Sequence, residues 1–354
     1  MFLYIHNGGV SRDLDIDAVQ QRYRRFARDE APHRSPLYAQ WAARVAADTE
    51  IAGVVARIPP LQRQPPLVFA VTRMLGAGLR SADEWAAWLR VHADQVVTEA
   101  ARRGVQTNEP LRCAALLAAL SRIAGPVALL EVGASAGLCL YPDRYSYRYR
   151  ADGHLVAEDP AEGPSSVVLE AEWRGAPPAL QLPEVVWRAG IDLQPRDAAD
   201  PGDRAWLTGL VWPGETGREQ RVLSALDIVA VDPPLLVAGD ASEALAVLMA
   251  QAPNDAALVV TTPGVLAHVP RAGREGIIEM ARRADHWITM DAAGLHSAVA
   301  GVWHPAPDPA QWPNGAFALA LDGQVIAAVD PLGAIIEPIG AGREWHPADP
   351  TPRG

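Results

Sequence analysis

Residues 127–141 read VALLEVGASAGLCLY, and this stretch decides how the rest of the chain is interpreted. The apolar run 127–132 is typical of a buried β-strand, and residues 133–137 after it form a tight turn that contains glycine. A turn of this kind fits two sites. It is either the G-x-S-x-G turn that presents a nucleophilic serine, here Ser135, in α/β-hydrolases, or a glycine loop against which a nucleotide-like cofactor binds.

The pattern on either side of this stretch favours an α/β fold. Residues 17–124 carry apolar side chains at helical spacing and contain no convincing strand. From residue 127 onward, strands alternate with helices, which is typical of a Rossmann-like, doubly wound parallel sheet. The expected strands are 127–132, 185–187, 235–238, 257–261 and 287–290, followed by a hairpin of 316–321 and 325–329.

Residues 142–182 interrupt this alternation with YSYRYR and SVVLEAEW, which are typical of short strands. We therefore predict an all-helical N-terminal cap domain over residues 1–124. An α/β domain follows over residues 125–340, with a small β insertion at 142–182. Residues 341–354 are expected to be a flexible tail.

Composition narrows the class of protein. The chain has 354 residues, of which 49% are hydrophobic, enough for one large core and an accessory domain. Its net charge of -11 disfavours nucleic acid and anionic membranes as partners. Its two cysteines form neither a disulfide framework nor a zinc cluster, so no metal is expected. Without a secretory leader or a membrane-spanning stretch, we expect a cytoplasmic protein that acts on a small molecule, with the oligomeric state left open.

The order of elements bears on the two interpretations of residues 133–137. A hydrolase serine normally follows several strands and an oxyanion loop, whereas this loop follows the first strand. The order therefore favours a cofactor loop. The hydrolase alternative stays open because His268 and His296 lie downstream and are candidate bases for Ser135.

Three acidic residues lie at strand ends around the loop: Glu131, Asp192 and Asp240. Carboxyl ends of parallel strands share one edge of a sheet, where ligands bind. Three carboxylates suit a neutral or cationic adenosyl cofactor and not a pyrophosphate, although each acid is alternatively a solvated loop residue or a helix cap. The predicted cofactor-binding residues are Glu131, Gly133, Ala134, Ser135, Gly137, Asp192, Asp240 and Ala241.

A polar cluster precedes the first strand. Asn108, Glu109 and Arg112 begin the helix expected over residues 110–123. We take Glu109 as a candidate catalytic group and Asn108 and Arg112 as candidate substrate contacts. Alternatively, Asn108 before a proline is the N-cap of that helix.

Further candidates lie in the insertion and after the fourth strand. Tyr145 begins an alternation of tyrosine and arginine, so one face of a strand would be aromatic and the other basic. Tyr145 and Arg144 are candidate substrate contacts, or else the rings pack in the core. Thr262, at the end of the fourth strand, is a further substrate candidate. His268 is the best-placed general base, although it is alternatively an ordinary loop histidine.

The segment DIVAVDPP at 227–234 is a second candidate site for the chemistry. Asp-Pro-Pro followed by an aromatic residue is how some amino-methylating enzymes hold an amine, but Leu235 stands where the aromatic is needed. Apolar residues before it repeat at helical spacing. We therefore predict a helix that two prolines end.

Several motifs carry a family resemblance. EVGASAGL at 131–138 and GDA at 239–241 resemble the first- and third-strand motifs of class I S-adenosylmethionine-dependent methyltransferases. VQTNE at 105–109, LEVGASAGL at 130–138, DRY at 143–145 and LVWP at 210–213 are similar to a bacterial family known as domain of unknown function 2332. That family pairs a helical N-terminal part with a methyltransferase-like core.

The resemblance spans residues 26–338 and implies a Rossmann-like core of class I methyltransferase type, with S-adenosylmethionine as cofactor. Two features depart from well-studied methyltransferases: Asp192 lies far downstream of the glycine loop, and TTPGVLAH at 261–268 matches no catalytic signature. The expected function is methyl transfer to an unidentified small molecule. The alternatives are a serine hydrolase that uses Ser135 and a non-catalytic protein of the same fold.

Overall fold

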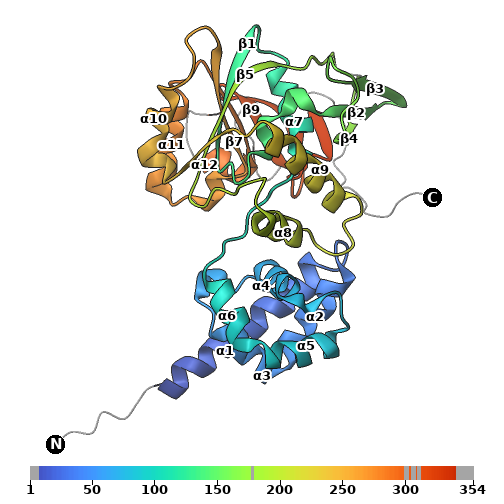
Figure 1. Ribbon diagram of the computed structural model, residues 1–354, viewed down its shortest axis with the longest axis vertical. Helices are drawn as coiled ribbons and strands as arrows, with labels where there is room; N and C mark the ends of the chain where they lie inside the picture. Colours follow the sequence, from blue (N-terminus) through green and yellow to red (C-terminus); the bar gives the residue numbers. More distant parts are fainter. Residues whose placement is uncertain (1–7, 177–178, 299–302, 304–307, 309–311, 340–354) are drawn as a thin grey trace, which may run out of the picture. The chain divides into compact units, whose positions relative to one another are not determined.

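The computed structural model describes residues 8–176, 179–298, 303, 308 and 312–339 (Figure 1). Packing divides the chain into two compact units. The first is Met1–Thr107 with Pro201–Gln220, and the second is Asn108–Asp200 with Arg221–Gly354. The functional division into a cap and a catalytic domain stays a prediction, and the tail expected at 341–354 lies outside the described residues.

The first unit is helical where it is described (Figure 1). Ser81 and Glu84 form the reciprocal hydrogen bonds of a capping box, as S-x-x-E predicts. The helix that begins after Ser81 ends at Val91, and α6 follows it from Ala93, with His92 between the two. The α-helices are α1 Gly8–Arg25, α2 Pro36–Ala47, α3 Thr49–Ala56, α4 Pro65–Thr72, α5 Ala82–Val91, α6 Ala93–Ala101 and α8 Pro201–Gly209.

Aromatic side chains form the core of this unit. Phe69 packs edge-on against Trp41 and Trp85, and those two indoles stack with ring centroids 5.1 Å apart. Trp212, from the second segment of the unit, packs on Phe26 at 5.1 Å. The LVWP motif at 210–213 therefore belongs to the helical core, which no local pattern indicated.

The second unit is built on one sheet. The described strands form an eleven-stranded sheet with the order β3-β2-β4-β11-β10-β9-β8-β7-β1-β5-β6. From β6 to β8 all neighbours are parallel, and from β8 to β11 they are antiparallel. The strands are β1 Pro126–Val132, β2 Ser146–Ala151, β3 His154–Glu158, β4 Val168–Trp173, β5 Glu184–Asp192, β6 Leu235–Ala238, β7 Ala257–Pro263, β8 His286–Ala292, β9 Phe317–Leu321, β10 Gln324–Val329 and β11 Ile335–Pro338.

The α/β class and the expected strands are confirmed, but the sheet is mixed and not parallel throughout. The residues of the expected insertion do not form a separate element, because β4 pairs with β11 and joins β2 and β3 to the main sheet. This pairing connects segments more than a hundred residues apart, so local patterns gave no sign of it. The hairpin of β9 and β10 is confirmed, and Asp322 and Gly323 both have the positive φ that its two-residue turn requires.

Helices cover both faces of the sheet. Helices α10 (Ala241–Met249) and α11 (Arg271–Ala281) pack on the face to which Leu130 and Val132 point, and they lie together in Figure 1. Helix α7 (Arg112–Leu120) packs against β4, β8 and β9. Because side chains alternate along a strand, Glu131 points to the face opposite α10 and α11.

Two further helices belong to the sheet unit or lead into it. The helix expected before Pro233 is α9, Arg218–Val231, and a short helix α12 spans Ala293–Ala298. No helix of the described residues is both long and apolar enough to cross a membrane.

Candidate functional site

The glycine loop is held tightly against β5. The amides of Gly133 and Ala134 both donate to the carbonyl of Ile191, at 2.8 and 3.3 Å, and Gly137 N–H donates to Ala134 at 2.6 Å. A Cβ added at Gly190 would lie 2.4 Å from the Ala134 side chain. Strand β5 therefore needs glycine at this position for the loop to pack where it does.

The two central amides of the loop bind side chains. Ser135 N–H donates to Oδ2 of Asp192 at 2.9 Å. Ala136 N–H donates to Oδ1 of Asn108 at 3.3 Å, and Nδ2 of Asn108 donates to Oγ of Ser135 at 2.9 Å. Every backbone amide of residues 133–137 thus donates to an acceptor within the protein. A phosphate needs such amides as donors, so the loop as folded does not form a phosphate cradle.

The surroundings of Ser135 bear on the hydrolase alternative. Ser135 has a left-handed backbone with a φ of 50°, a strained conformation that a nucleophile turn also uses. In such a turn the N–H of the residue after the serine stabilises the oxyanion. Here that N–H, on Ala136, is bound to Asn108, and Ser135 Oγ accepts from an amide rather than an imidazole. His268 is exposed in a short turn, and the side chain of His296 lies outside the described residues.

Asp192 and Asp240 lie on neighbouring strands. Asp192 ends β5, and its Oδ1 accepts from Gln194 N–H at 2.8 Å. Its backbone carbonyl accepts from Gly239 N–H at 2.9 Å, directly before Asp240. Asp240 is the N-cap of α10 and accepts from the N–H and hydroxyl of Ser242. These hydrogen bonds lower the pKa of Asp240, which therefore presents an ionised, exposed carboxylate at the sheet edge beside Ala241.

The buried guanidinium of Arg112 lies at the carboxyl ends of the central strands. Arg112 donates to the carbonyls of Pro263 at 2.9 Å and Pro331 at 3.1 Å. A Cβ at Gly264 would lie 3.0 Å from its Nη2, so the chain after β7 needs glycine beside it. Glu131 is buried nearby, and its Oε2 has no hydrogen-bond partner in the described part of the chain. Burial raises the pKa of Glu131, and the charge of Arg112 opposes this effect.

Asp291 is a buried acid that was not among the residues predicted from the sequence. It is fully buried near the carboxyl end of β8, where Thr289 Oγ1 contacts its Oδ2 at 3.5 Å. Burial raises the pKa of Asp291 to about 7, against the opposing effects of the Ala267 amide and the charge of Arg112. The signal was present, because Asp291 directly follows the strand expected over residues 287–290, and Asp192 and Asp240 also come after expected strands.

Asn108 and Glu109 have different structural roles from those expected. The interpretation of Asn108 as an N-cap is wrong: α7 begins at Arg112, and the Asn108 side chain binds the glycine loop instead. Glu109 is fully buried, and its Oε1 accepts from Leu111 N–H at 3.0 Å and from Nε of Arg221 at 2.8 Å. Glu109 therefore stabilises the start of α7 and anchors α9, and Arg221 is a partner that no sequence motif indicated.

The remaining substrate candidates lie mainly in the core. Tyr145 is fully buried and donates its hydroxyl to the carbonyl of Leu138 at 2.7 Å, directly after the loop. Thr262 is fully buried and accepts from Nε1 of Trp287 at 3.1 Å. Their burial favours structural roles. Arg144 is exposed, and its Nε lies 3.5 Å from the carboxylate of Asp143.

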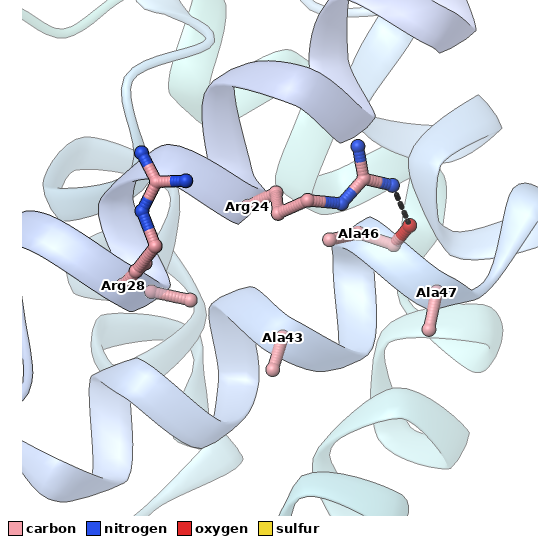
Figure 2. A pocket seen from close by; sticks show the side chains of 6 residues that line it. Arg24, Arg28, Ala43, Ala46 and Ala47 are labelled. Atoms are coloured by element: carbon pink, nitrogen blue, oxygen red, sulfur yellow. Dashed lines mark hydrogen bonds between the residues drawn. The ribbon is translucent and has the colours of Figure 1, made fainter.

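A hollow of about 350 Å³ lies apart from these residues, in the helical unit (Figure 2). Alanine side chains line it, with Arg24 and Arg28 at its sides, as Figure 2 shows. Arg24 donates to the carbonyl of Ala46 at 3.5 Å, and Arg28 binds Asp29. In the part of the chain that the structure describes, no motif residue and no buried acid lines this hollow.

The chain was compared with known proteins. No curated protein and no solved structure matches it. Residues 20–321 match a family described as "Uncharacterized protein conserved in bacteria (DUF2332)". This match covers most of the chain and confirms the family to which the motifs at 105–109, 130–138, 143–145 and 210–213 pointed. The protein therefore belongs to the bacterial family DUF2332.

Proposed function

We propose that the protein binds S-adenosylmethionine at the carboxyl edge of β1, β5 and β6 and transfers its methyl group to a small molecule. One observation carries this proposal: Asp192 ties the glycine loop to the start of the Asp240 segment. Its carboxylate accepts from Ser135, and its carbonyl accepts from Gly239. The loop and the two acids thus border one edge of the sheet.

The strand order supports a Rossmann-like core. Counted along the chain, the parallel strands β6, β5, β1, β7 and β8 are the third, second, first, fourth and fifth. In this order the chain reverses direction across the sheet beside β1, and doubly wound proteins bind ligands at that point. The distance in sequence between the loop and Asp192 has a simple cause. Residues 142–182 intervene, but β5 still pairs directly with β1.

The residues present fit an adenosyl group better than a dinucleotide. The exposed carboxylate of Asp240 is an acceptor for a ribose hydroxyl or an adenine amine, and Asp192 lies beside it. The loop amides are already bound, so a pyrophosphate finds no donors there. A Cβ at Gly133 would lie 2.6 Å from Val265, so that side of the loop is covered. The cofactor would therefore be held by acidic side chains at the edge rather than by bare backbone at Gly133.

The cofactor would supply the electrophilic methyl group, and the protein would position the acceptor and remove its proton where it carries one. Glu109 is held in its ion pair with Arg221, which disfavours the role of base expected for it. His268 stays a candidate because it is exposed after β7. Asp291 has a pKa of about 7, which suits proton transfer near neutral pH, but its full burial favours a structural role.

Isothermal titration calorimetry with S-adenosylmethionine and S-adenosylhomocysteine tests the proposal on the full chain. Saturable binding of either compound supports it, and adenosine diphosphate is the matched control that we expect not to bind. Folded protein that binds neither adenosyl compound would falsify the proposed function. Binding without methyl transfer to any acceptor would support the non-catalytic alternative.

The left-handed backbone of Ser135 favours the alternative of a serine hydrolase. A fluorophosphonate probe tests that function directly. We expect no labelling, because Asn108 binds both Ser135 Oγ and the amide of the following residue. Labelling of the wild type that disappears in Ser135→Ala would establish the hydrolase instead.

A further inference from the structure

The only two cysteines of the chain lie side by side next to the glycine loop. Cys113 belongs to α7, and Cys139 lies in the short turn after the loop, 26 residues further along. Cys113 Sγ contacts the carbonyl of Cys139 at 3.7 Å, and Cys139 Sγ contacts the carbonyl of Glu109 at 3.6 Å.

Their environments make the two thiols unequal. The interaction with the neighbouring Cys113 thiol and the charge of Arg112 lower the pKa of Cys139, although burial opposes them. Burial raises the pKa of Cys113. A thiol with a lowered pKa beside a second thiol is the arrangement in which a thiolate is oxidised first and the neighbour then resolves it.

We propose that Cys113 and Cys139 form an oxidative modification site that a hydroperoxide converts into an intramolecular disulfide. The Cys139 thiolate attacks one peroxide oxygen, the O–O bond breaks, and the departing hydroxide takes up a proton to become water. The resulting sulfenic acid is attacked by the Cys113 sulfur. The S–S bond forms while the S–O bond breaks, and the hydroxyl leaves as water with the Cys113 proton. Two thiols lose two electrons, and hydrogen peroxide is reduced to two water molecules.

Access to the pair sets the order and the rate of this reaction. Cys139 is 7% exposed, whereas Cys113 is fully buried. The oxidant therefore reaches Cys139 first, and the reaction is slower than that of an open thiol because it requires local opening. The disulfide would join α7 covalently to the turn after the glycine loop. It would fix the start of α7, just after Asn108, against the loop that Asn108 binds.

Peptide mass spectrometry tests the site on the full chain. The protein is treated with hydrogen peroxide, unfolded, and alkylated with N-ethylmaleimide. The expected product is a monomer that takes up no maleimide, weighs two hydrogen atoms less, and yields one cross-linked peptide pair containing Cys113 and Cys139. Dithiothreitol should restore two alkylated cysteines. Two alkylated cysteines after long exposure, a disulfide between chains, or a stable sulfinic acid on Cys139 would each overturn the proposal.

Two variants separate the steps. Cys113→Ser should give a sulfenic acid at Cys139 that dimedone traps, because the resolving thiol is absent. Cys139→Ser should leave Cys113 as an alkylatable thiol. The opposite pattern, with Cys113 oxidised first, would contradict the proposed order. The wild-type experiment decides the site even where a variant folds poorly, and it is independent of whether the chain binds S-adenosylmethionine.

Discussion

Asn108 and Ser135, 27 residues apart, are joined side chain to side chain, with Nδ2 of the amide donating to the hydroxyl over 2.9 Å. The other amide atom of Asn108 accepts from the N–H of Ala136. One buried side chain before α7 therefore satisfies two polar groups of the glycine loop. The conformation of the loop depends on a residue outside it, and removal of that residue leaves buried polar atoms without partners.

Asn108→Ala should destabilise the protein by about 1–3 kcal/mol, because Ala136 N–H and Ser135 Oγ lose their partner in a buried place. Urea unfolding measures this as a lower free energy of unfolding. Asn254→Ala is the control, since Asn254 is exposed in a loop of the same unit. Equal stabilities for the two variants would show that the Asn108 hydrogen bonds do not hold the loop.

Ser135→Gly should be more stable than Ser135→Ala by about 1 kcal/mol, because a left-handed backbone is costly for any residue with a Cβ. Both variants remove the hydroxyl that accepts from Asn108, so their difference isolates the backbone conformation. The comparison uses urea unfolding of both at one pH. An alanine variant as stable as the glycine variant would mean that the φ of 50° stores no strain.

Asp291 should make stability depend on pH. Its carboxyl has an ordinary pKa of 3.8 and a folded pKa of about 7. Between these values the folded chain keeps a proton that the unfolded chain releases, so rising pH lowers the free energy of unfolding. The stabilisation that comes from the proton on Asp291 is complete below about pH 4 and is lost as pH rises to about 7. Over this range the free energy of unfolding falls by at most about 1.4 kcal/mol per pH unit.

Asp291→Asn should therefore gain stability relative to the wild type between pH 4 and 7. Urea unfolding at several pH values measures the difference, and Asp255→Asn, at an exposed loop position, is the control. Parallel curves for Asp291→Asn and the wild type would show that this carboxyl does not hold its proton in the folded chain.

Asp240→Ser should weaken binding of S-adenosylhomocysteine by about tenfold while leaving the melting temperature nearly unchanged. Serine is also a good N-cap and preserves the start of α10, but it removes the carboxylate offered to the ligand. Calorimetry measures the affinity, with Asp255→Ser as the control. An unchanged affinity would remove Asp240 from the site without rejecting a cofactor site elsewhere on the sheet edge.

Local patterns were sufficient for much of this protein. Apolar runs along the sequence predicted the strands of the parallel region. Residues at the carboxyl ends of parallel strands lie at one edge of the sheet, whatever their distance in sequence. On this basis the sequence predicted that Asp192 lies beside the glycine loop, and its carboxylate does accept from Ser135 N–H. The same rule applied to the strand before Asp291 would have found that residue as well.

Other features required the folded chain. The pairing of β4 with β11, the packing of Trp212 in the helical core and the contact between Cys113 and Cys139 join segments far apart in sequence. Sequence periodicity reports which face of an element is apolar, and so it determined the elements and their burial. Which partner satisfies each buried polar group depends on long-range packing, and only the tertiary structure decided that Asn108 binds the loop instead of capping its own helix.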